Sequence, residues 1–75
     1  MMKNIDHIAH QVVATNNVEE KRALVLDVVE NFQFKGWKDE VRNSWKRKVN
    51  AANARRLDEM ILNLAMKATG DGVIG

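Results

Sequence analysis

The chain contains no cysteine in 75 residues, so neither a disulfide framework nor a thiolate metal site is available to hold it together. A chain of this length buries little apolar surface, and packing alone must stabilise it. Its residues are 45% hydrophobic and 29% charged, with no proline, a composition typical of a folded helical chain. We therefore expect one all-α domain over residues 1–75, a small bundle of three to four short helices whose marginal core favours self-association or a permanent partner.

Apolar residues spaced by three and four residues predict two helices in the first half of the chain. The first is expected over about residues 3–14. The second begins after Asn17, which lies three residues before Glu20 in the spacing of a capping box, and ends before Gly36, a glycine suited to a left-handed turn. Residues 24–29 are rich in β-branched side chains, so a strand is the alternative there.

The second half of the chain predicts one or two further helices. A third helix is expected over about residues 37–49. Residues 50–53 form either a turn or part of one continuous helix, because asparagine caps helices whereas alanine extends them. The final helix is expected from residue 57 to a stop at residues 69–70, with a flexible tail over residues 71–75. The predicted core consists of Ile5, Ile8, Val12, Leu24, Val25, Val28, Phe32, Val41, Trp45, Leu57, Ile61 and Leu64.

Positive charge is concentrated in the middle of the chain. Residues 35–56 hold eight Lys or Arg and two Asp or Glu, a net charge of +6, while the segments before and after each carry −2. A helical surface of this sign suits an acidic protein face or a polyanion. The alternative is a solvated surface neutralised within the chain, for example by Asp58 and Glu59 meeting Arg55 and Arg56.

Two tryptophans lie beside the basic residues. Trp37 and Trp45 are eight residues apart, about two turns on one helical face. Three roles are consistent with this spacing: packing in the core, anchoring a protein interface, or stacking on nucleic-acid bases. The predicted partner-binding residues are Lys35, Trp37, Lys38, Arg42, Trp45, Lys46, Arg47, Arg55 and Arg56.

No residue pattern indicates catalysis or a cofactor. His7 and His10 with Asp6 lack a third metal ligand and a supporting shell. Ser44 is outside any Gly-x-Ser-x-Gly context, and the Asp and Glu pairs near predicted helix starts are explained by the helix dipole. We therefore predict no enzyme activity, no metal, no cofactor and no small-molecule substrate.

The leading functional hypothesis is a non-enzymatic interaction protein that docks its basic, tryptophan-bearing helix on an acidic surface of a larger protein assembly and modulates it. The alternative is nucleic-acid binding through the same helix, either non-specifically or as a helix-turn-helix. We expect a cytoplasmic protein with no membrane-spanning segment. Its size and lack of motifs are typical of small regulatory accessory proteins of compact viral or mobile genomes.

Overall fold

The computed structural model describes residues 5–32, 34 and 36–71. Its helices are α1 (Ile5–Ala14), α2 (Val18–Asn31), α3 (Asp39–Ala51) and α4 (Ala54–Asp71). The valine-rich stretch at residues 24–29 lies within α2, so the strand alternative is wrong. The all-α prediction is confirmed, with four helices in the described part of the chain.

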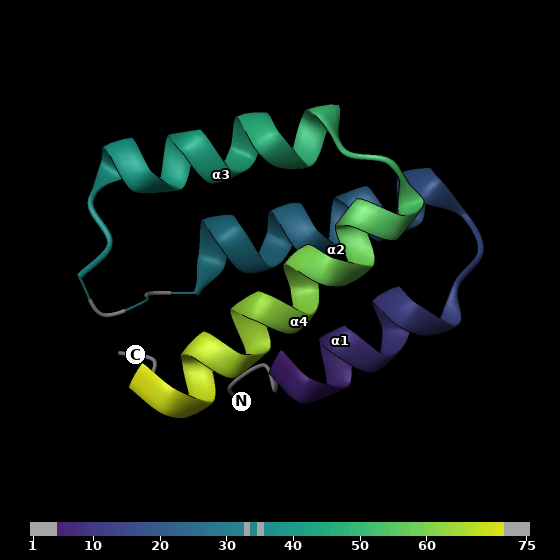
Figure 1. Ribbon diagram of the computed structural model, residues 1–75, viewed down its shortest axis with the longest axis horizontal. Helices are drawn as coiled ribbons and strands as arrows, with labels where there is room; N and C mark the ends of the chain where they lie inside the picture. Colours follow the sequence, from purple (N-terminus) through teal and green to yellow (C-terminus); the bar gives the residue numbers. More distant parts are fainter. Residues whose placement is uncertain (1–4, 33, 35, 72–75) are drawn as a thin grey trace.

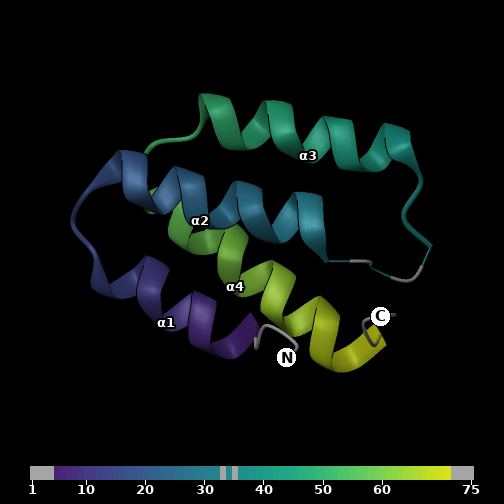
Figure 2. The ribbon, with the colours of Figure 1, turned by 180° about the vertical axis from the view of Figure 1, so that it is seen from behind.

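Helix α2 is the central element of the bundle. Helices α1 and α4 pack on each other and on α2, and α3 packs on α2. Figures 1 and 2 show α3 and α1 on opposite sides of α2, with α4 crossing between them. The apolar core therefore lies among α1, α2 and α4, and α3 is the peripheral helix.

Asparagine side chains mark two helix starts. The Asn17 side chain accepts a hydrogen bond from the Glu20 backbone N–H at 3.0 Å, so the predicted cap of α2 is confirmed. Asn53 accepts from the Arg56 backbone N–H at 2.8 Å in the same way. Residues 50–51 belong to α3, so only residues 52–53 of the predicted turn separate α3 from α4, and the continuous-helix alternative is wrong.

Other predicted boundaries need correction. Helix α2 ends at Asn31, and Gly36 has its positive φ of 82° in the connection to α3 rather than at a helix cap. Helix α4 continues through the predicted stop to Asp71, because one glycine costs only about 1 kcal/mol in a helix whose apolar face is already anchored. The predicted tail over residues 71–75 is wrong at residue 71, which ends α4, and its other residues, 72–75, lie outside the described residues, as does the predicted start of α1 at residues 3–4.

The predicted core is largely confirmed. Seven of its residues are buried, namely Ile8, Val12, Val25, Val28, Leu57, Ile61 and Leu64. Four more pack against them while partly exposed, namely Ile5, Leu24, Phe32 and Trp45. The prediction is wrong for Val41, which is 37% exposed because α2 covers only one side of α3. The buried apolar residues outside the predicted set are Ala9, Val29, Phe34, Val49, Ala52, Met60, Ala65 and Ala68.

A charged side chain also belongs to the interior. The Nζ of Lys21, in α2, is 2.7 Å from the Val12 carbonyl oxygen in α1 and 2.7 Å from Oδ1 of Asp58 in α4. The side chain of Lys21 is 6% exposed, so these contacts replace most of its hydration. Lys21 therefore joins the three helices of the core, and Asp58 binds Lys21 instead of the predicted Arg55 or Arg56.

Candidate interaction surface

The basic residues of α3 that are predicted to bind a partner fall into two groups, because some of them contact α2. Nη2 of Arg42 donates a hydrogen bond to the Phe32 carbonyl oxygen at 3.2 Å, just past the end of α2. Nζ of Lys46 lies 3.1 Å from Oε1 of Glu30. These two cations therefore hold α3 against α2.

A third cation holds the other end of α3. Arg22, in the second turn of α2, donates from Nη2 to the Ala52 carbonyl oxygen at 2.8 Å and from Nε to the Val49 carbonyl oxygen at 3.3 Å. Carbonyl groups at a helix C-terminus lack partners within the helix, so a guanidinium stabilises that end. The sequence contains no signal for this contact, because Arg22 lies far from α3 along the chain.

Four other basic side chains are exposed and make no ion pair or hydrogen bond within the described part of the chain. They are Lys38, Arg47, Lys48 and Arg55. Arg56 is also exposed but lies 3.4 Å from Oε1 of Glu59. Lys35 lies outside the described residues.

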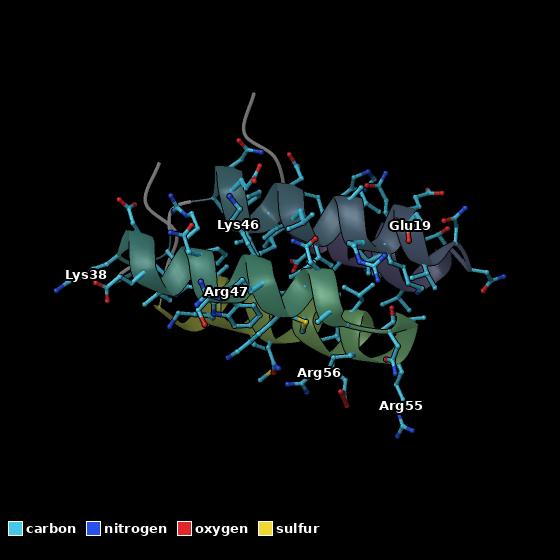
Figure 3. The ribbon with its side chains drawn as sticks, turned by 90° about the horizontal axis from the view of Figure 1, so that it is seen from above. Glu19, Lys38, Lys46, Arg47, Arg55 and Arg56 are labelled. Atoms are coloured by element: carbon cyan, nitrogen blue, oxygen red, sulfur yellow. The ribbon has the colours of Figure 1, made fainter. Side chains whose placement is uncertain are left out.

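The direction of these side chains follows from helix geometry. At about 100° per residue, Lys46 and Lys48 lie on opposite flanks of α3, and Arg47 between them points away from α2. Figure 3 shows Lys46 on the side of α2, Lys38 at one end of the molecule and Arg55 at the other. We call Lys38, Arg47 and Arg55 the outer cationic face.

Acidic residues lie near the same surface. Asp39 and Glu40 are exposed in the first turn of α3, and Glu59 is exposed on α4. The helix dipole also stabilises carboxylates at a helix start. The outer cationic face is therefore a spaced row of positive charges with acids near it.

Both tryptophans belong to a series of aromatic contacts. The ring centroids of Phe32 and Phe34 are 6.3 Å apart, those of Phe34 and Trp37 are 4.5 Å apart, and the two indoles stack at 5.6 Å. Both indoles are half-buried. The series fastens the connection after α2 to α3, and it leaves part of each indole accessible.

The remaining candidate chemistry is sparse. His7 and His10 are exposed on α1, and Ser44 is half-buried on α3. Across the described residues, no three His, Cys, Asp or Glu side chains come together in a way that could hold a metal ion. None of the described helices combines the length and apolar character needed to cross a membrane.

The arrangement places exposed cationic side chains at both ends and on the outer side of the helical bundle. Comparison of the chain with protein-family models, with curated proteins and with solved structures gives no match.

Proposed function

We propose that this protein is a non-enzymatic interaction module that docks its outer cationic face on an acidic surface of a larger protein. The observation that supports this proposal is the exposure of Lys38, Arg47 and Arg55 without ion-pair partners among the described residues. Exposed arginines are enriched at protein interfaces, and uncompensated charge steers a partner of opposite sign into the encounter.

The acids beside this face favour a protein partner over a nucleic acid. Asp39, Glu40 and Glu59 would repel a continuous phosphate backbone, whereas a protein surface can place its own cations opposite them. The three cations of the outer cationic face would neutralise about three phosphates at most, which corresponds to a slope of log affinity on log salt of about −2 to −3.

A charge-neutralising variant tests the proposal. We expect K38Q/R47Q/R55Q to lose the partner that the wild-type chain retains from a nuclease-treated lysate of its native cell, because the attraction between opposite charges is removed. The matched control is H7E/H10E/Q11E, which changes the net charge by the same −3 at exposed positions on α1. The measurement is quantitative mass spectrometry of the retained proteins, and recovery of the same set with all three chains would contradict the proposal.

Titration of a fluorescent DNA duplex separates the two classes of partner. We expect no binding at about 50 mM salt and micromolar protein, where even non-specific DNA-binding proteins bind. Binding that is lost in K38Q/R47Q/R55Q and retained in H7E/H10E/Q11E would instead identify a nucleic acid as the partner.

A further inference from the structure

Helix α4 exposes the two most accessible large apolar side chains of the described chain. Leu62 is 51% exposed and Met66 is 72% exposed. Together with the exposed Glu59 they are spaced by three and then four residues, which places all three on one side of the helix. We call Glu59, Leu62 and Met66 the α4 stripe.

Helix α3 carries a second incompletely covered stripe. Val41 is 37% exposed, Trp45 is half-buried and Lys48 is exposed. Their spacing of four and then three residues places them on the flank of α3 opposite Lys46, which is the cation that reaches α2. We call Val41, Trp45 and Lys48 the α3 stripe.

We propose that the α4 stripe binds the α3 stripe of a second copy of this chain, with the two helices antiparallel. The residue spacings of the two stripes match when the helices are antiparallel. Toward the N-terminus of α3, Trp45 lies three residues before Lys48 and Val41 lies four residues before Trp45. Toward the C-terminus of α4, Leu62 lies three residues after Glu59 and Met66 lies four residues after Leu62. One register therefore brings Lys48 opposite Glu59, Trp45 opposite Leu62, and Val41 opposite Met66. The charged pair is complementary, and both other pairs are apolar.

The arrangement closes as a symmetric dimer. In one copy, α3 and α4 run in opposite directions along the molecule (Figure 1). A two-fold axis directed midway between the direction of α4 and the reversed direction of α3 therefore makes each α3 antiparallel to the α4 of the other copy. Both contacts form at once, and no stripe is left open to propagate a filament.

The pairing uses side chains suited to an interface. Burial of Leu62 and Met66 removes apolar surface from water, and a flexible methionine packs readily beside an indole or an aliphatic side chain. The Lys48–Glu59 pair at the edge fixes the register. Arg47 points away from this contact, so the dimer goes beyond the proposed function and does not depend on it.

Sedimentation equilibrium of the full chain tests the dimer. We expect the wild-type chain to sediment at twice its 8.5 kDa mass at about 100 µM, a concentration at which a contact of micromolar affinity is saturated. Replacing both exposed apolar residues, in L62Q/M66Q, should weaken association by at least about 100-fold, since each side chain contributes about 1.5 kcal/mol or more when buried. The control V13Q alters a valine that is 50% exposed on α1 and should remain dimeric.

Charge reversal tests the register itself. K48E and E59K should each weaken association by about 5- to 10-fold, because each dimer contains the pair twice and each reversal replaces a modest exposed attraction with a repulsion. The double variant K48E/E59K should recover wild-type association to within about threefold, because the pair is restored with its charges exchanged. Circular dichroism confirms that each variant is folded.

Three results would overturn the dimer. These are a wild-type chain that is monomeric at about 100 µM, where micromolar contacts are populated, an L62Q/M66Q chain that still dimerises, and a K48E/E59K chain no stronger than its single variants. None of these results changes the expected loss of a partner in K38Q/R47Q/R55Q, so the failure of one proposal is distinguishable from the failure of the other.

Discussion

Replacing Asp58 with alanine is expected to lower the free energy of unfolding by about 2–4 kcal/mol. The change leaves the Lys21 ammonium group buried, with only the Val12 carbonyl oxygen as a partner. Removing one member of a buried ion pair costs about 3–5 kcal/mol, and the expected loss extends below that range because the Asp58 side chain is 34% exposed and water screens part of the attraction.

Urea denaturation of three further variants tests whether the stability lost in D58A comes from the unpaired Lys21 charge. K21M should cost less than D58A, because it removes the buried charge and leaves a carboxylate that reaches water. K21M/D58A should therefore be more stable than D58A alone, a coupling that a double-mutant cycle measures. In E59A the change removes an exposed carboxylate 3.4 Å from Arg56 and should cost less than about 1 kcal/mol at protein concentrations where the chain is monomeric. A D58A loss as small as the E59A loss would show that the pair does not stabilise the core.

Replacing Leu64 with alanine should also unfold a large fraction of the protein. Leu64 is fully buried on the core-facing side of α4, and truncating such a side chain costs about 2–5 kcal/mol. The core of a chain this small rarely supplies more than about 3–5 kcal/mol of stability. Thermal denaturation followed by circular dichroism should therefore show little or no folded baseline at 25 °C.

The matched control is L62A, two residues earlier on the same helix. Because Leu62 is 51% exposed, its truncation should cost less than about 1 kcal/mol at protein concentrations where the chain is monomeric. Equal losses for L62A and L64A would contradict the burial of Leu64.

The parts of the fold that the sequence predicts depend on short-range signals. Asn17 and Glu20 are three residues apart, so their cap is determined within one turn. Leu57, Ile61 and Leu64 likewise follow one helical face, and that face must be covered wherever the helix packs. Such signals are independent of the rest of the chain, and the structure confirms them.

The parts that the sequence does not predict depend on distant partners. Lys21 and Asp58 are 37 residues apart, and their contact requires the final packing of α2 on α4. Phe34 lies between helices, where helical periodicity gives no information about burial. Val41 and Val49 fit the same apolar spacing, but only Val49 lies under α2 and is fully buried.

The cations of the candidate site also depend on distant partners, so the sequence does not predict which of them are exposed. Arg42 and Arg47 belong to one run of basic residues, and spacing alone gives no means of separating them. The difference comes from the opposite side of the contact, where α2 ends beside Arg42 and offers it the Phe32 carbonyl oxygen. Arg47 points away from α2, and it therefore belongs to the outer cationic face.

The peripheral position of α3 has a consequence for its motion. Across Asp39–Ala51, Val49 is the one buried residue, and the other attachments are half-buried aromatic contacts and polar bonds to α2. Cooperative segments with few apolar contacts open before the rest of a protein. Helix α3 is therefore expected to unfold transiently while the other three helices keep their amide protons protected from solvent exchange. A partner that binds the outer cationic face would slow that opening. Binding would therefore be detectable as slower amide-proton exchange in α3, the helix that carries most of the surface.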